Sequence, residues 1–220
     1  MMKYLSIIIC LMSGVWGSLQ ASSAAEITVL ALGDSITEGG EHFVCYRKFL
    51  PEMLKAKGMP YTFIGPKKDS DSAHAGYSGK NTAYLASIIG DVYMQYPADI
   101  VLLHSGHNSF SKDRPVAGIL RSTDSIVRTI LQINPDAIIL IAQVITAGKL
   151  PKYDYIPELN ASIADYVENS KYADHLVLVD QAEGFDWHTD TIYDKVHPNA
   201  IGARKMAARW LAMFRVMEHL

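Results

Sequence analysis

The chain alternates short apolar runs with longer amphipathic stretches from residue 26 onward. Several of the apolar runs are continuous and lack the in-and-out alternation of a strand with one solvated face. Continuous runs are typical of strands covered on both faces. We predict five strands, at Ile27–Leu32, Tyr61–Gly65, Ile100–His104, Ala137–Val144 and His175–Asp180.

Stretches with apolar residues at helical spacing lie between and after these runs. We predict five helices, at Tyr46–Lys57, Thr82–Tyr96, Pro115–Ile133, Pro157–Asn169 and Asn199–Glu218. Strands that alternate with helices need right-handed crossovers, which build a parallel sheet between two helical layers. The predicted fold class is therefore α/β, a three-layer α/β/α domain with a five-stranded parallel sheet.

The first 25 residues differ from the rest of the chain. Lys3 is their only charge, and an apolar stretch and a run of small residues follow it, as in a secretory signal peptide. A membrane anchor is the alternative, but the apolar stretch is short for a span of about 20 residues and no basic cluster follows it. We expect residues 1–25 to be removed after Ala24 or Ala25. Residues 26–220 would then form one secreted or periplasmic domain, without stable membrane insertion.

Composition excludes several classes of protein. Apolar residues make up 49% of the chain and charged residues 20%, which rules out a disordered or low-complexity protein. Lys and Arg number 20 against 23 Asp and Glu, and no basic stripe is present, so we expect no nucleic-acid partner. Removal of the signal peptide would leave Cys45 as the single cysteine, so the domain must be stabilised by its core rather than by a disulfide.

Polar clusters follow four of the five predicted strands, at the edge where open parallel sheets bind ligands. Each cluster alone is explained by a helix cap or a tight turn. Together they supply a hydroxyl, backbone and carboxamide donors, and an Asp–His pair that can hydrogen-bond. The clusters are Gly33–Gly39, Gly76–Asn81, Ser105–Ser109 and Asp194–Asn199.

In their order and placement these clusters resemble the four blocks of the SGNH hydrolases, also called the GDSL esterase/lipase superfamily. The resemblance covers essentially the whole chain after the signal peptide. Gly-Asp-Ser-Ile-Thr-Glu-Gly at 33–39, His-Ala-Gly-Tyr-Ser-Gly at 74–79 and Leu-Leu-His at 102–104 are most similar to secreted carbohydrate esterases, the acetylxylan esterases of carbohydrate esterase family 3. The resemblance implies a flavodoxin-like SGNH hydrolase fold and a carboxylic ester hydrolase.

The resemblance also assigns roles to five residues. Ser35 matches the nucleophile, His197 the general base and Asp194 the carboxylate that orients it. The oxyanion hole would consist of the backbone N–H groups of Ser35 and Gly79 and the side-chain amide of Asn108. These roles imply ester hydrolysis through an acyl-enzyme intermediate.

The third block departs from the family pattern. It usually reads Gly-x-Asn-Asp, and here Ser109 replaces the Asp. That Asp supports the loop in the family, so the change bears on the geometry of Asn108 and not on the triad. Asp34 is expected to be structural and to tie the turn that presents Ser35.

The remaining candidates for chemistry are histidines, as metal ligands, and aromatic residues, as sugar contacts. The histidines form no metal motif such as His-Glu-x-x-His, and the nucleotide-binding motifs are absent, so we expect no metal and no cofactor. Aromatic residues on or near the predicted loops could stack on sugar rings, or could belong to the core. They are Tyr77, Tyr153, Tyr155, Trp187 and Tyr193.

The expected partner is a small-molecule or polysaccharide ester, and an O-acetylated carbohydrate is favoured. Two alternatives remain open. One is a lysophospholipase or thioesterase that acts on longer acyl chains. The other is a non-catalytic carbohydrate-binding protein on the same scaffold. The sequence leaves the oligomeric state undetermined.

Overall fold

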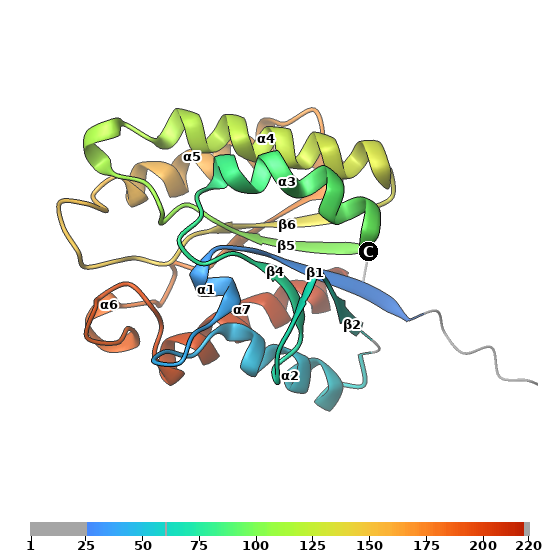
Figure 1. Cartoon of the computed structure of the whole chain (residues 1–220), viewed down its shortest axis with the longest axis horizontal. Coiled ribbons are helices and arrows are strands. Elements are labelled where there is room, and N and C mark those ends of the chain that lie inside the picture. Colours follow the sequence, from blue (N-terminus) through green and yellow to red (C-terminus); the bar gives the residue numbers. More distant parts are fainter. Residues whose placement is uncertain (1–25, 60, 218–220) are drawn as a thin grey trace, which may run out of the picture.

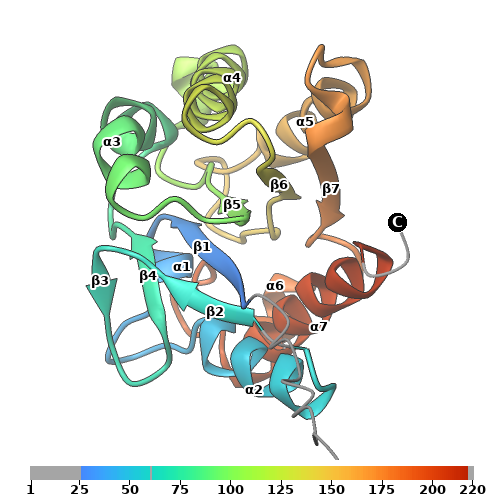
Figure 2. The same ribbon diagram turned by 90° about the vertical axis from the view of Figure 1, so that its right-hand side faces the viewer.

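A central β-sheet is covered on both faces by helices (Figure 1). The structure is a computed structural model and describes residues 26–59 and 61–217. One face carries three helices, α3 (Thr82–Gln95), α4 (Val116–Ile133) and α5 (Ile156–Asn169). The other face carries α2 (Leu50–Ala56) and α7 (Ala200–Met217), as the end view in Figure 2 shows. The predicted three-layer α/β/α fold is confirmed. The predicted signal peptide, residues 1–25, lies outside the described residues.

The sheet holds seven strands within the described residues, in the order β3-β4-β1-β5-β6-β7, and β2 also pairs with β1. Every pairing is parallel except that of β3 with β4. The strands are β1 (Ile27–Gly33), β2 (Tyr61–Ile64), β3 (Lys67–Lys68), β4 (Ala73–Gly76), β5 (Ile100–His104), β6 (Ile138–Gln143) and β7 (Leu176–Asp180).

The predicted number of five strands was wrong, because one edge of β1 is shared by two strands. β2 pairs with residues 27–30 of β1, and β4 pairs with Leu32 and Gly33. The chain leaves the sheet between them and forms β3, which pairs with β4 in the antiparallel sense. The two-residue Lys67–Lys68 strand and the short Ala73–Gly76 strand have no long apolar run, so the periodicity gave no signal for either.

The apolar runs are continuous because alternate residues of each strand enter two different cores. Leu30 and Leu32 of β1 pack under α3, α4 and α5, whereas Val29 packs under α2 and α7. In β5, Val101 belongs to the core under α3, α4 and α5, and Leu102 belongs to the core under α2 and α7. All five residues of β5 are buried, as expected for a central strand.

The predicted helices lie close to their expected positions, and shorter ones lie between them. The stretch predicted as one helix from Tyr46 begins as a single 3-10 turn, Tyr46–Lys48, and continues as α2. Two unpredicted helical turns, α1 (Ser35–Glu38) and α6 (Trp187–Asp190), lie in loops after strands. None of the helices formed by the described residues combines the length and the apolar character needed to span a bilayer.

Two glycines let the strand ends converge. Gly33 at the end of β1 pairs with Gly76 of β4 on one side and with His104 of β5 on the other. A Cβ atom on Gly33 would lie 2.3 Å from Thr37 Oγ1 and 2.4 Å from the carbonyl oxygen of His104. A Cβ on Gly76 would lie 2.5 Å from the backbone nitrogen of Glu38. Any larger residue would therefore push α1 away from the sheet edge.

Candidate active site

Ser35 is the first residue of α1 and follows directly after the turn that leaves β1. Asp34 caps this turn, since its Oδ1 accepts a 2.9 Å hydrogen bond from the backbone N–H of Ile36. Complete burial raises the pKa of Asp34 to about 7, and the backbone N–H groups of Ile36, Gly106 and His107 oppose that shift only in part. Asp34 thus ties the turn that presents Ser35, as the sequence indicated.

A hydrogen-bonded chain joins the two ends of the domain at this edge of the sheet. Ser35 Oγ lies 2.9 Å from His197 Nε2, and His197 Nδ1 lies 2.5 Å from Asp194 Oδ2. The side chains of His197 and Asp194 are 24% and 21% exposed, so a ligand in solvent can reach them. A hydroxyl, an imidazole and a carboxylate in this order can act chemically as a nucleophile, a base and the group that orients the base.

Backbone N–H groups of the loop around His197 hold the carboxylate of Asp194 in place. Asp194 Oδ1 accepts hydrogen bonds from the backbone N–H groups of Val196 (2.9 Å) and His197 (3.0 Å). Partial burial alone would raise the pKa of Asp194, but these bonds and the one from the His197 ring outweigh it and lower that pKa. An ionised Asp194 favours a proton on Nδ1 of His197, which leaves Nε2 free to accept the proton of Ser35.

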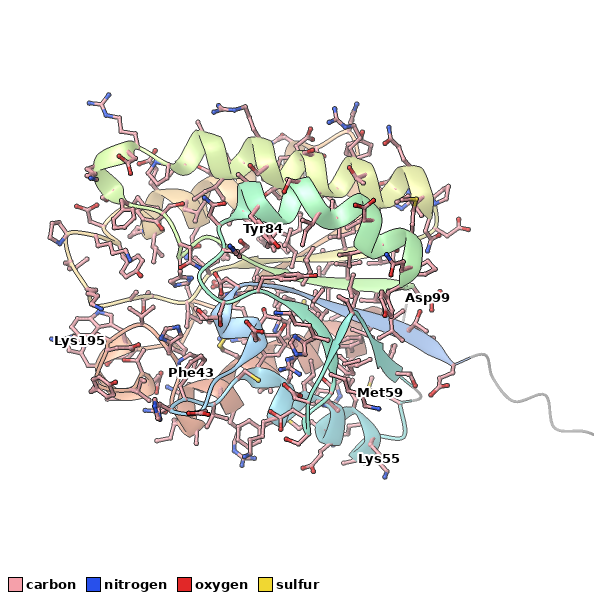
Figure 3. All side chains as sticks on the ribbon, viewed as in Figure 1. Phe43, Lys55, Met59, Tyr84, Asp99 and Lys195 are labelled. Atoms are coloured by element: carbon pink, nitrogen blue, oxygen red, sulfur yellow. The ribbon has the colours of Figure 1, made fainter. Side chains whose placement is uncertain are left out.

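The ring of Phe43 covers one face of His197. The two ring centroids lie 4.2 Å apart, with 28° between the ring planes. Figure 3 shows Phe43 and Lys195 at the same end of the molecule, opposite Asp99 at the start of β5. The packing limits rotation of the imidazole, and nothing in the sequence near Phe43 indicated it.

The two other predicted oxyanion donors lie on neighbouring segments. Asn108 Nδ2 donates a 2.9 Å hydrogen bond to the carbonyl oxygen of Lys80, the residue that follows Gly79. Gly79 has φ +73°, a conformation that favours glycine. The backbone N–H of Tyr77 donates to the carbonyl oxygen of Gly33, which fixes this segment against the end of β1. The structure therefore brings Ser35, His197 and Asp194 into direct contact and places Gly79 beside Asn108.

Residues 31–205 match the GDSL-like Lipase/Acylhydrolase family, a span that contains every one of these side chains. The chain belongs to this family. The predicted superfamily and the predicted enzyme class, a carboxylic ester hydrolase, are thereby confirmed.

Several proteins similar to this GDSL-like hydrolase are named esterases. A multidomain esterase of Ruminococcus flavefaciens is 30% identical over 228 aligned positions, which cover 87% of this chain but 29% of that protein. A family 3 carbohydrate esterase of Clostridium thermocellum has a TM-score of 0.72 at 26% identity, covering 87% of this chain and 98% of that one. A family 3 carbohydrate esterase of Talaromyces cellulolyticus has the same fold, with a TM-score of 0.78 at 23% identity, covering 88% and 99%.

Two charged residues that the sequence analysis did not single out hold the segments of this site together. Glu38 of α1 accepts a hydrogen bond from the backbone N–H of Ser78 at 2.5 Å and one from Lys67 Nζ at 2.6 Å. It thereby links the helix of Ser35 to the residue before Gly79. The motif signal around Ser35 includes Glu38, but only the fold shows what its side chain contacts.

The guanidinium of Arg47 is fully buried beneath α1. It donates to the carbonyl oxygens of Thr37 (2.7 Å) and Glu38 (2.6 Å), and to both oxygens of Asp69 (3.0 and 2.6 Å). It also donates to the backbone and side-chain oxygens of Ser72. Partial burial alone would raise the pKa of Asp69. The hydrogen bonds and the charge of Arg47 outweigh it and hold that pKa well below its ordinary value.

The aromatic residues proposed as sugar contacts divide into two groups. Tyr153 and Tyr155 are buried, and the Tyr155 hydroxyl donates a 2.6 Å hydrogen bond to the carbonyl oxygen of Gly106, so these two rings belong to the core. Tyr193 is 87% exposed. Trp187 is half-buried, and the ring of His188 stacks on it with centroids 3.5 Å apart.

A groove of about 620 Å³ adjoins Phe43 and Glu38 of α1, the helix that carries Ser35. Its walls come from residues 38–48 and from residues 67–74, and they include Glu38, Lys48 and Lys67. Across the described ranges, no three His, Cys, Asp or Glu side chains gather in a way that could hold a metal ion.

Proposed function

We propose that this GDSL-like hydrolase is a secreted serine esterase that removes O-acetyl groups from carbohydrates. One observation carries the proposal: the unbroken hydrogen-bonded chain from Ser35 through His197 to Asp194 at the carboxyl edge of the sheet. That chain also argues against the non-catalytic alternative, because a binding protein has no need to keep a base aligned on a hydroxyl.

In the proposed reaction His197 Nε2 takes the proton of Ser35 Oγ as the oxygen attacks the ester carbonyl. The negative oxygen of the intermediate accepts hydrogen bonds from the N–H groups of Ser35 and Gly79 and from the amide of Asn108. One N–H of Asn108 Nδ2 is held by the carbonyl oxygen of Lys80, which leaves the other for the substrate. His197 then protonates the departing alcohol, and water repeats the sequence to release the acid.

The proposed substrate class rests on the relatives and on the groove. The solved structures with this fold include family 3 carbohydrate esterases, and one is named an acetyl esterase. The groove that begins at Glu38 and Phe43 is lined mainly by charged and polar side chains. Such a lining suits a hydroxyl-rich sugar, whereas a fatty acyl chain needs apolar walls. We therefore favour acetylated carbohydrate over the long-chain alternative.

The test is acetate release from acetylated sugars and polysaccharides, measured beside medium-chain nitrophenyl esters. Ser35→Ala should abolish turnover and covalent labelling by an organophosphate. Asn108→Ala should lower kcat/KM by about 100-fold, or roughly 3 kcal/mol, the usual cost of one oxyanion donor. Ser87→Ala, a serine exposed on α3, is the matched control and should retain the wild-type rate. A well-folded Ser35→Ala protein with full esterase activity would overturn the proposal.

Export is the part of the proposal that rests on residues 1–25 alone. N-terminal sequencing of the protein recovered outside the cytoplasm should begin at Ala25 or Glu26. Recovery of the uncleaved chain only from the cytoplasm would contradict export and leave the esterase proposal standing.

A further inference from the structure

A second pocket lies beside the loop that carries Asn108. It has a volume of about 540 Å³ and lies between residues 110–112 and residues 151–154. The two segments are joined by a 3.0 Å hydrogen bond from the backbone N–H of Ser111 to the carbonyl oxygen of Lys152. Phe110 lines the pocket and is 48% exposed, which is unusual for a large aromatic ring.

Two ammonium groups flank this aromatic ring. Lys152 Nζ lies 4.6 Å from the centroid of the Phe110 ring, and Lys112 Nζ lies 5.8 Å from it. Within the described part of the chain, neither lysine forms an ion pair with a carboxylate. Asp154 is the one acidic residue that lines the pocket, so the pocket has an excess of positive charge.

The excess extends along the rim of the active site. On the side of the site that holds Asn108 and His197, four segments are joined by backbone and side-chain hydrogen bonds, residues 77–81, 105–115, 144–155 and 191–199. They contain six Lys or Arg residues against three Asp, and one of those three is Asp194, which is bound to His197. Of the three carboxylates on the neighbouring residues 183–190, Asp190 pairs with Lys205, Glu183 pairs with Arg209, and Asp186 contacts the ring of His188. The whole chain has a net charge of −3, so the positive rim is a local feature.

The geometry points to a subsite for a uronate, a sugar ring that carries a carboxylate, next to the acetylated sugar. An aromatic face with adjacent ammonium groups matches both parts of such a ligand: the C–H face of the ring can pack on Phe110, and the carboxylate can pair with Lys112 and Lys152. Phe110 is two residues from Asn108, at most about 7 Å along the chain, so one oligosaccharide can reach both. This inference rests on the proposed function and names the substrate class of the same site.

The test compares kcat/KM on three acetylated oligosaccharides of equal length at low salt. One is neutral, one carries a uronate as a branch and one has uronates in its main chain. We expect about a tenfold preference for at least one uronate substrate over the neutral one, from two exposed charge pairs, and a loss of that preference at about 1 M salt. The two uronate arms distinguish a branch from a main-chain residue.

Charge reversal of both lysines, Lys112→Glu with Lys152→Glu, should reduce the preference to about one. Lys171→Glu is the matched control, because Lys171 Nζ also lies over an aromatic ring, Tyr172 at 4.9 Å, but near the start of β7. The control should keep the wild-type preference. If the double variant fails to melt cooperatively, Lys112→Glu alone supplies the test, since Lys112 is exposed.

Equal rates on uronate and neutral substrates in the wild type would overturn the inference, and so would a preference that survives charge reversal. Failure of the proposed function has a different signature, which is no hydrolysis of nitrophenyl acetate by the wild type. In that case calorimetry, which compares the binding of an oligouronide with that of a neutral oligomer, tests the subsite independently of hydrolysis. Tighter oligouronide binding that is lost in the double variant supports the subsite, and equal binding rejects it.

Discussion

Arg47→Met should destabilise the protein by about 3 kcal/mol. Methionine keeps most of the apolar volume but removes a fully buried guanidinium that satisfies the carbonyl oxygens of Thr37, Glu38 and Ser72 and both oxygens of Asp69. Removing one partner of a buried ion pair costs about 3–5 kcal/mol. The Asp69 side chain is 40% exposed, so water can solvate its carboxylate in the variant, and we expect the lower end of that range.

The assay is urea and thermal unfolding at pH 7. For a domain of this size about 3 kcal/mol corresponds to a fall in Tm of roughly 6–12 °C. Lys48→Met is the matched control, because Lys48 is an exposed neighbour on the same turn and should change stability by less than about 0.5 kcal/mol. Since Arg47 lowers the pKa of Asp69, its contribution is present above about pH 4 and decreases as Asp69 becomes protonated at lower pH. A variant within about 1 kcal/mol of the wild type at pH 7 would refute the reasoning.

Two further predictions concern α1, the helix that carries Ser35, and the turn before it. Burial raises the pKa of Asp34 to about 7, so the folded protein holds a proton that the unfolded chain releases near pH 4, and wild-type stability should fall relative to Asp34→Asn as pH rises from about 4 to 7. Urea unfolding at pH 5 and pH 8 measures this, and a stability difference that is the same at both values would contradict it. Glu38→Ala should lower kcat by roughly tenfold with a smaller change in KM, because it frees the Ser78 segment that precedes Gly79, whereas Glu38→Gln keeps an acceptor and should retain more activity. Steady-state kinetics on nitrophenyl acetate check this, and a wild-type kcat in Glu38→Ala would rule out a positioning role.

The pattern of apolar residues along the chain predicted most of the strands and helices, and the strands that it missed lack such a pattern. β1, β5 and β6 were predictable because each has a run of apolar residues that is buried on both faces of the sheet. β3 and β4 were missed because a two-residue strand of lysines and a strand of small residues gain their stability from pairing and not from their own composition.

The site was predictable as a set of motifs but not as a set of contacts. The order and placement of the four polar clusters carried the family resemblance, and the roles that the resemblance implies for Ser35, Asp194 and His197 stay predictions. The contacts made by Phe43 and Arg47 depend on segments that only the fold brings together. The sequence left two interpretations open for Tyr153 and Tyr155, sugar contact or core, and the fold supports the core, where both rings pack.

Because β2 and β4 share one edge of β1, the length of the segment between them can vary in this enzyme. β2 and β4 each pair with β1 independently, so the excursion between them can gain or lose residues without altering the register of either strand. That excursion, residues 65–72, supplies one wall of the groove beside α1, the helix that carries Ser35. Insertions there would reshape this groove while leaving the hydroxyl, imidazole and carboxylate untouched, and under the proposed function this makes the segment a place to engineer specificity.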